Sequence, residues 1–437
     1  MHIHRFCLLS VFVSAIALQA QASDKMPPLI DPQQDNIALA DMNDPNAAMT
    51  LQLALALAVA NNPELMAYSW ETRAQDGKIL QAGLLPNPEL ELAAEQVGGT
   101  GGYQGFNSAQ TTVQITQTIQ LGNKRLKNKQ LAVLDKSLAV WDYEAKRLDI
   151  WMEVIKTYVE NLAIQQRLEL DTELLSIAQQ MKNVVADKVA AGKVSPVEET
   201  KAFVVLSSVQ IELARTMRNL TAAQKNLAAL WGGEPKFSKV EGDLTTLQDI
   251  PDQKQFLESL AQNPDIARWD TELKHRNAAL EVEKSKAIGD LTVFAGSQQF
   301  RETDDAAFVF GITIPLPLFD RNQGAISEAK SRASKAHYQS QAENVRVKTA
   351  ISQAYQQLMQ SFEQAKTLET KIIPGAQSVF DAAQEGYKYG KFSHLEMLDA
   401  QRTLFEVKQQ YIETLASYHK ARADVNRLVG DNSDIMK

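Results

Sequence analysis

The 437-residue sequence contains a single cysteine, few aromatic residues and no long hydrophobic run. Cys7 lies in an N-terminal segment with a positive charge at Arg5, an apolar core and a small-residue cleavage site at residues 20–22, as in secretory signal peptides. We expect residues 1–22 to be removed on export, which leaves no thiol for a disulfide, a metal site or a nucleophile. Beyond this segment no apolar run of about 18 residues or more occurs, so we expect no membrane-spanning helix.

Charge and motif content exclude further classes of function. The formal net charge of −8 argues against a nucleic-acid partner. No G-x-S-x-G, H-E-x-x-H or P-loop motif is present, so we do not expect an enzyme. The histidines beyond the signal peptide do not pair with another His or a Cys at helical spacing, so the sequence predicts no metal site and no cofactor. These histidines are His275, His337, His394 and His419.

A tandem duplication organises the rest of the chain. The segment VAAGKVSPVEETKA contains Gly192, and the similar segment YKYGKFSHLEMLDA contains Gly390, 198 positions later. An Asn-Pro pair at residues 62–63 returns at residues 263–264. Because self-similarity at one fixed period marks repeated structural units, the sequence predicts two halves of one architecture.

Each G-K-x-S segment lies between two apolar-periodic runs, so we expect it to form the tip of a helical hairpin. Gly192 or Gly390 would end the first helix in the left-handed conformation. Ser195 or Ser393 would cap the second helix, and a glutamate three residues later would complete a capping box in both copies.

Two segments have the period of β-strands rather than helices. In residues 89–121 and 290–318 apolar residues recur at every second position around a polar loop, so we expect a β-hairpin in each half, with strands of about ten residues. The last strand carries four large apolar residues on one face: Phe308, Phe310, Ile312 and Ile314. Such a face is what a membrane barrel turns towards lipid, although a soluble sandwich would also show it.

A very long helix is expected after each hairpin. From residue 131 apolar residues follow the alternating three- and four-residue spacing of coiled-coil packing. A helix over residues 123–188 would be about 100 Å long. The equivalent run, residues 322–386, is interrupted by Pro374-Gly375, where the first copy has Ser176. We therefore expect a kink in the second copy alone.

These boundaries divide the chain into six parts. They are a signal peptide at 1–22, an extended N-terminal arm at 23–49, a first repeat at 50–232 with its tip at 189–195, an equatorial linker at 233–253, a second repeat at 254–430 with its tip at 387–393, and a C-terminal tail at 431–437. Four strands are too few for a membrane barrel, whose strands cannot leave unpaired edges in hydrocarbon. If the strands lie in a membrane, several copies must share one barrel, and three copies would supply twelve strands.

The sequence resembles the TolC-type outer-membrane efflux family. The resemblance rests on the N-P-[ED]-hydrophobic motif near the start of each repeat, on QTIQLGNKR and IPLPLFDRNQGAI between strand and long helix, and on YKYGKFSHLEMLDAQRTL at the second tip. It extends from about residue 50 to residue 430. The PLPLFDRNQG segment makes the chain most similar to the outer-membrane components of cobalt-zinc-cadmium type cation pumps.

The resemblance implies a mainly α fold with membrane β structure. A tandem-duplicated TolC-like chain would form a homotrimer with a twelve-stranded β-barrel in outer-membrane lipid, continuous with a long twelve-helix α-barrel in the periplasm of a Gram-negative bacterium. The belt around the middle of the helices would draw on residues 50–60, on residues 232–255 and on the C-terminal tail. The chain would be the passive exit duct of a tripartite efflux pump for divalent heavy-metal cations.

The resemblance also implies that the hairpin tips meet a periplasmic adaptor protein, which joins the duct to an inner-membrane pump of the RND type. The residues carried over to this role are Gly192, Lys193, Val194, Ser195, Gly390, Lys391, Phe392 and Ser393. The repetition and the expected exposure of Val194 and Phe392 favour docking. A G-K-x-S sequence is equally what a tight turn without a partner requires.

Asp381 and Glu385 lie four positions apart, on one helix face, shortly before the second tip. In a threefold assembly, inward-pointing carboxylates here would form an acidic ring that attracts cations and repels anions, as a gate at the periplasmic end. Asp187 before the first tip is a further candidate. The alternative interpretation is a solvated helix face.

Two other functions stay open from the sequence. The same duct would serve a drug-efflux or type I secretion system, because only the partners differ. A secreted coiled-coil scaffold without a pore would also contain long helical hairpins, but it would be soluble without detergent.

Overall fold

The computed structural model describes residues 48–260 and 263–430, all of which belong to the unit Ile37–Lys437. The expected signal peptide, nearly all of the expected arm and the C-terminal tail lie outside the described residues. The strands are β1 (Ala48–Met49), β2 (Glu89–Glu95), β3 (Gln110–Ile119), β4 (Lys239–Val240), β5 (Leu291–Phe300) and β6 (Asp305–Thr313). The helices are α1 (Leu51–Asn61), α2 (Pro63–Ala82), α3 (Lys124–Ala190), α4 (Pro196–Ala229), α5 (Gln253–Ser259), α6 (Pro264–Lys286), α7 (Gln323–Thr367), α8 (Ile373–Lys388) and α9 (His394–Val429), with a π-helical segment at Leu368–Ile372 and a short 3-10 turn at Gly101–Tyr103.

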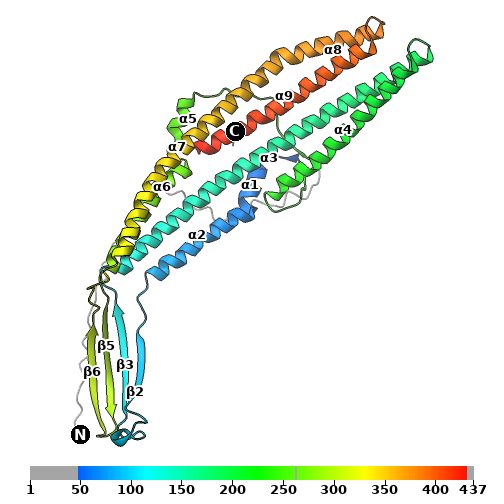
Figure 1. The fold of residues 1–437 in the computed structure, drawn as a ribbon. Helices are drawn as coiled ribbons and strands as arrows, with labels where there is room; N and C mark the ends of the chain where they lie inside the picture. Colours follow the sequence, from blue (N-terminus) through cyan, green and yellow to red (C-terminus); the bar gives the residue numbers. More distant parts are fainter. Residues whose placement is uncertain (1–47, 261–262, 431–437) are drawn as a thin grey trace. The chain divides into compact units, whose positions relative to one another are not determined.

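The long helices form an open layer. α4 packs on α3, α3 on α9, and α9 on α7 and α8, whereas α2 and α6 cover the end of α3 that is nearer the sheet. Figure 1 shows α4 and α8 on opposite flanks of this layer, with the two hairpin tips at one end and strands β2, β3, β5 and β6 beyond the other. The layer is therefore closed on neither flank within one chain.

A repeated asparagine closes each half. Asn62 caps α2 by accepting a hydrogen bond from the Leu65 N–H at 2.9 Å, and its side-chain nitrogen donates to the carbonyl of Leu230 at 2.8 Å. Asn263 likewise caps α6 and donates to the carbonyl of Leu428 at 2.7 Å. An N-cap oxygen and a donor amide on one side chain thus join the start of each repeat to the end of its returning helix.

The sheet joins the two halves. Its order is β2-β3-β5-β6, all antiparallel, and the central β3–β5 pair, which runs from Gln110 opposite Phe300 to Ile119 opposite Leu291, brings together strands of different repeats. β2 and β6 are the edge strands, and each leaves one row of backbone donors and acceptors without a partner strand.

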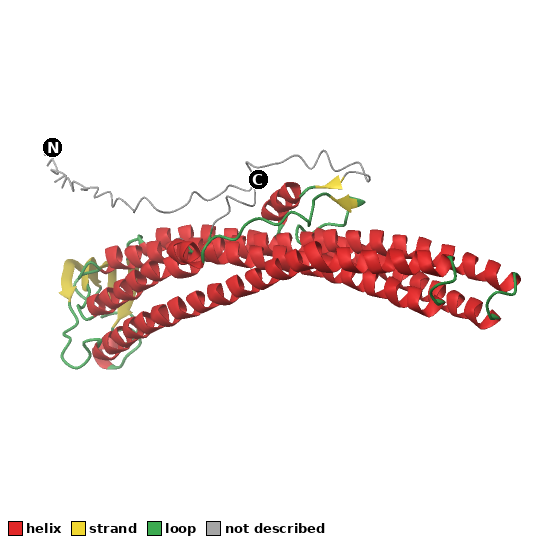
Figure 2. Ribbon diagram, turned by 90° about the horizontal axis from the view of Figure 1, so that it is seen from above, coloured by secondary structure: helices red, strands yellow, loops and turns green. Residues whose placement is uncertain are grey.

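A belt lies on one face of the long helices. β1 pairs in parallel with β4, and Figure 2 shows these strands and α5 on the same face of the helices. The Tyr158 hydroxyl of α3 contacts the carbonyl of Met49 at 2.7 Å and also that of Glu241. Burial raises the pKa of Tyr158 to about 12, so the group remains a donor.

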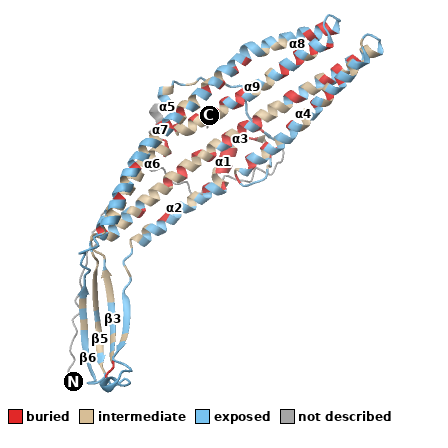
Figure 3. Ribbon diagram, in the orientation of Figure 1, coloured by how far each residue is buried: buried red, intermediate tan, exposed pale blue. Residues whose placement is uncertain are grey.

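The hydrophobic core follows the helices rather than the sheet. Figure 3 shows buried residues mainly along the facing sides of the helices, whereas strands β2, β3, β5 and β6 are intermediate or exposed. The largest buried cluster joins α1, α3 and the belt around Leu55, Ile150 and Leu227, and a second lies near the tips around Met181 and Met397. No helix within residues 48–260 and 263–430 combines the length and apolarity needed to cross a bilayer.

The expected interruption of the second long helix is confirmed, and α3 is continuous over 67 residues. The break takes the form of the π-helical segment, which ends just before Pro374. A π turn accommodates one extra residue, so the backbone absorbs the proline by widening instead of ending the helix. Figure 1 shows the run changing direction between α7 and α8.

Candidate functional site

The two hairpin tips have the same backbone. Gly192 (φ +68°) and Gly390 (φ +73°) adopt the left-handed conformation. The Lys193 N–H donates to the carbonyl of Lys188 at 2.9 Å, and the Lys391 N–H donates to the carbonyl of Gly386 at 2.8 Å. This six-residue closure is the Schellman motif, which satisfies the free carbonyls at a helix end.

The capping of the outgoing helices differs from the expectation. At the second tip Ser393 and Glu396 form the expected capping box. At the first tip the Ser195 hydroxyl accepts from the Val197 N–H at 3.3 Å, but the carboxylate of Glu198 pairs with Lys201 at 2.8 Å. The prediction of a box in both copies is therefore wrong for the first, because Lys201 competes for the carboxylate where the second copy has an aspartate.

The apolar tip residues are not equally exposed. Phe392 is exposed, but it lies across the helix end so closely that a Cβ added to Gly386 would stand 2.0 Å from its ring. Val194, which was expected to be exposed, is half-buried. Of the two residues at the third position of G-K-x-S, Phe392 is therefore the exposed one, and Gly386 beneath it leaves room for the ring.

A contact between the hairpins lies directly below the tips. The Lys188 ammonium of α3 donates to the carbonyl of Tyr387 in α8 at 2.8 Å and lies 3.6 Å from the centre of the Tyr387 ring. Burial and the neighbouring Lys193 lower the pKa of Lys188. Tip residues from different repeats are thus held together by one cation.

The acidic gate candidates are exposed helix residues. Asp381 and Glu385 lie one turn apart on α8, and Asp381 accepts a hydrogen bond from Gln377 at 2.8 Å. Asp187 is exposed on α3, in the other hairpin. The structure thus brings Asp381 and Glu385 to one face and leaves Asp187 on a different helix.

One face of the sheet is apolar and open. Directly paired residues share a face, so Leu90, Ile115, Ala295 and Phe310 form one row across the four strands. Phe308 is 89% exposed, Phe310 84% and Ile312 67%. Ile314 does not belong to this strand, because β6 ends at Thr313 and the following Pro315 has no N–H to donate.

The opposite face of the sheet carries carboxylates and no cation. Glu89, Glu91 and Glu95 of β2 and Asp305 of β6 all lie on this face by register, and none of the strands β2, β3, β5 and β6 contains Lys or Arg. This acidic face is not among the features predicted from the sequence. The alternation Glu-Leu-Glu-Leu at 89–92 was the signal, because it fixes the leucines on one face and the glutamates on the other.

Exposed apolar residues also line both flanks of the helix layer. On α4 they recur every seven positions, at Val197, Val204 and Ile211. On the other flank Val379 and Ile372 are seven apart. Counted from the glycine of each tip, Val204 and Val379 are 12 and 11 residues away, and Ile211 and Ile372 are 19 and 18. The two stripes therefore lie at matching depths.

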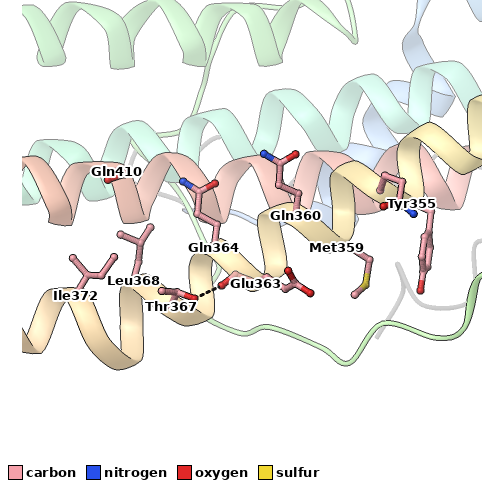
Figure 4. Close-up of a pocket in the computed structure, with 10 residues that line it drawn as sticks. Tyr355, Met359, Gln360, Glu363, Gln364, Thr367, Leu368, Ile372 and Gln410 are labelled. Atoms are coloured by element: carbon pink, nitrogen blue, oxygen red, sulfur yellow. Dashed lines mark hydrogen bonds between the residues drawn. The ribbon is translucent and has the colours of Figure 1, made fainter.

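A polar groove adjoins the π-helical segment. Its lining includes Gln360, Gln364, Met359 and a single carboxylate, Glu363, of α7, together with Gln410 of α9. Figure 4 shows Gln360 and Gln364 one turn apart, with Gln410 on the neighbouring helix. Amides without a cluster of charges offer weak binding to a metal cation.

The histidines are dispersed. His275 pairs with Asp135 at 2.7 Å, His337 contacts Gln341 at 3.1 Å and His419 contacts the carbonyl of Leu244 at 2.9 Å. In the described part of the chain no three His, Cys, Asp or Glu side chains are grouped to hold a metal ion.

The chain matches a known protein family and several characterised relatives. Residues 54–233 and 257–431 each match the family described as outer membrane efflux protein. The chain is similar to the cobalt-zinc-cadmium resistance protein CzcC of Cupriavidus metallidurans, with 35% identity over 87% of this chain and 90% of the relative. It is also similar to the nickel and cobalt resistance protein CnrC of the same species, with 25% identity over 69% of this chain and 70% of the relative.

A solved structure shares the fold. The crystal structure of a membrane protein from Pseudomonas aeruginosa superposes with a TM-score of 0.76 and 18% identity, covering 87% of this chain and 90% of that one. At this level of identity the likeness concerns the fold alone.

Proposed function

Because this chain belongs to the outer membrane efflux protein family, we propose that it is the outer-membrane exit channel of a pump that removes divalent heavy-metal cations. As a member of this TolC-type family it is an outer-membrane transport duct and not an enzyme. The observation that carries the choice of substrate is the similarity over most of its length to a cobalt-zinc-cadmium resistance protein. The alternative of a secreted scaffold without a pore is excluded by the family.

The sheet supports a shared barrel. Four strands with open edges at β2 and β6 cannot remain unpaired in hydrocarbon. Edge strands of neighbouring copies would pair, and three copies would give the twelve strands expected above. The row of Phe308, Phe310 and Ile312 would then face lipid, with the acidic face towards the lumen.

The helix layer supports the same assembly. The stripe on α4 and the stripe on α8 and the preceding π-helical segment are the apolar flanks of an otherwise open layer. α4 runs away from the tips and α8 runs towards them, so the α4 of one copy would pack antiparallel on the α8 of the next, at matching depths. Closing three layers in this way gives a tube of long helices, as the homotrimer requires.

The polar face of the sheet supports cationic cargo. With Glu89, Glu91, Glu95 and Asp305 from each copy, the lumen would be negative along its length and free of strand-borne positive charge. Such a field concentrates cations and repels anions. At the periplasmic end of the duct we likewise propose an acidic gate ring at Asp381 and Glu385, with Asp187 as a third candidate.

The tips are the proposed docking surface for a periplasmic adaptor, which would connect the duct to an inner-membrane pump of the RND type. The residues of this chain that we propose to contact the adaptor are Gly192, Lys193, Val194 and Ser195 of the first tip and Gly390, Lys391, Phe392 and Ser393 of the second. The shared Schellman backbone supports this role, because it presents the same exposed turn in both hairpins.

Deletion of the gene tests the proposal. Cells without the chain should tolerate less zinc, cobalt or cadmium salt and accumulate more of the metal, and the intact gene should restore both. Unchanged tolerance to all three metals, together with new sensitivity to organic compounds, would overturn the choice of cations in favour of drug efflux.

A further inference from the structure

His394 is a buried histidine at the point where the two hairpins meet. It is the first residue of α9, directly after the N-cap Ser393, and it is 6% exposed. Its ring lies 5.5 Å from that of Tyr387 in α8, centre to centre. Tyr387 in turn receives the Lys188 ammonium from the first hairpin. His394 therefore packs on the residue that joins the two repeats.

The polar atoms of this cluster lack partners. Within the described part of the chain, neither the two ring nitrogens of His394 nor the hydroxyl of Tyr387 makes a hydrogen bond. Buried polar groups are nearly always paired, and each unpaired one costs about 1–3 kcal/mol. An imidazole kept in this position without a hydrogen bond is a group for which a function other than packing is to be sought.

The charges around His394 oppose its protonation. Lys188 of α3 and Lys201 of α4 face it with positive charge, and Glu198 of α4 is the carboxylate that faces it. From α8 it meets Tyr387, whose pKa is raised by burial and by Glu198. On its own helix it lies at the positive N-terminal end. Burial, with the two lysines, lowers the pKa of His394 below the usual 6.5 despite Glu198.

We propose that His394 is an acid-sensitive switch at the tip, and that its protonation separates the two hairpins and opens the periplasmic end of the duct. The inference rests on the proposed function, since it concerns the regulation of that duct. An imidazolium would be a buried cation beside the ammonium that holds Tyr387, while the nearby Glu198 is already paired with Lys201 at 2.8 Å. Moving the hairpins apart hydrates both positive charges.

The direction of the pH dependence follows from the pKa of His394 in the joined and in the separated tip. In the joined tip His394 protonates below its usual range, whereas in the separated tip it protonates near 6.5. The joined tip is therefore fully stable above about pH 6.5 and loses stability as the pH falls from there through the lowered pKa. One proton changes the ratio of separated to joined tips by at most about tenfold per pH unit.

Spin labels test the movement directly. Ala191→Cys and Tyr389→Cys place one exposed label on each tip of the full-length chain, diluted with unlabelled chain so that distances within one copy dominate. The distance should lengthen between about pH 7.5 and about pH 5. In His394→Phe, which keeps the ring contact but cannot titrate, it should stay constant, whereas the exposed His337→Gln should behave as the parent does.

The possible results test the proposed switch and the proposed channel independently. A label distance that ignores pH in the parent chain, or that still changes in His394→Phe, overturns the switch. If His394→Phe does not give a folded trimer, His394→Gln takes its place with the same expectation. Currents through planar lipid bilayers form the second arm: acid-dependent current in the parent but not in the variant supports the switch. No current at any pH contradicts the proposed duct, while the label distances still decide the fate of the switch.

Discussion

Equivalent positions of the two repeats carry different residues where the two hairpins contact each other. Lys188 and Gly386 occupy equivalent places, 198 residues apart, at the start of the two Schellman turns. The lysine reaches across to Tyr387, and the glycine lies beneath the ring of Phe392. Each residue therefore makes a contact that its counterpart could not make, and both contacts stabilise the second tip.

Gly386→Ala should displace Phe392, because the added Cβ would stand 2.0 Å from the ring. Overpacking of this kind costs about 1–3 kcal/mol, and we expect a lower thermal midpoint in detergent together with reduced metal tolerance in cells. Gly375→Ala is the matched control, since nothing lies within 4 Å of the new Cβ and alanine favours a helix by about 0.5–1 kcal/mol. Equal behaviour of the two variants would contradict the packing of Phe392 described above.

At the scale of elements, the π-helical segment Leu368–Ile372 is what separates the two long helical runs. A π turn holds one residue more than an α turn, so removing one residue restores an α-helix without rotating the flanking faces. The residues on either side, Ala365 and Phe380, are buried and would stay so. The extra residue of the π turn therefore leaves the buried faces on both sides of it aligned.

Deletion of exposed Glu369 should therefore leave folding and trimer formation intact, because the flanking faces keep their orientation, although Pro374 would still bend the run. Deletion of exposed Glu173 in continuous α3 is the control, because it rotates every later side chain by about 100° and takes the apolar stripe out of the core. Circular dichroism and the yield of heat-stable trimer measure both. Equal loss in the two deletions would show that the π turn is not a simple insertion.

The elements were predictable where a strong period runs over many residues. The helices and the strand hairpins follow from spacing, and the interruption at Pro374 follows from one residue type. The first capping box failed because Lys201 competes for Glu198, and Ile314 fell outside its strand because Pro315 ends the pairing. The contact of Lys188 with Tyr387 joins residues 199 positions apart, and no local pattern encodes such a meeting.

At the scale of the assembled molecule, the flanking stripes fix which residues of neighbouring copies should touch. Val204→Cys with Val379→Cys should yield a disulfide-linked ladder of dimers and trimers on a non-reducing gel. The chain offers a clean background, because its single other cysteine lies in the expected signal peptide. Val204→Cys with Val345→Cys is the control, since Val345 is exposed but far from the matching depth. Ladders in both pairs, or in neither, would rule out the proposed register.

The two sets of carboxylates should differ in what they control. Glu89→Gln with Glu91→Gln and Glu95→Gln should lower the cation-to-anion permeability ratio of the channel, measured as a reversal potential across a salt gradient in planar lipid. Asp381→Asn with Glu385→Gln should instead remove block by multivalent cations added at the tip side. A reversal potential that all three strand substitutions leave unchanged would contradict an acidic lumen in the sheet.

Because only one of the two repeats contains the π turn, a closed ring of three copies would present six tips of two alternating kinds. Its rotational symmetry would be threefold and never sixfold, despite the duplicated sequence. An adaptor that touched all six tips would have to make two different sets of contacts, so identical adaptor subunits would occupy inequivalent positions around the rim.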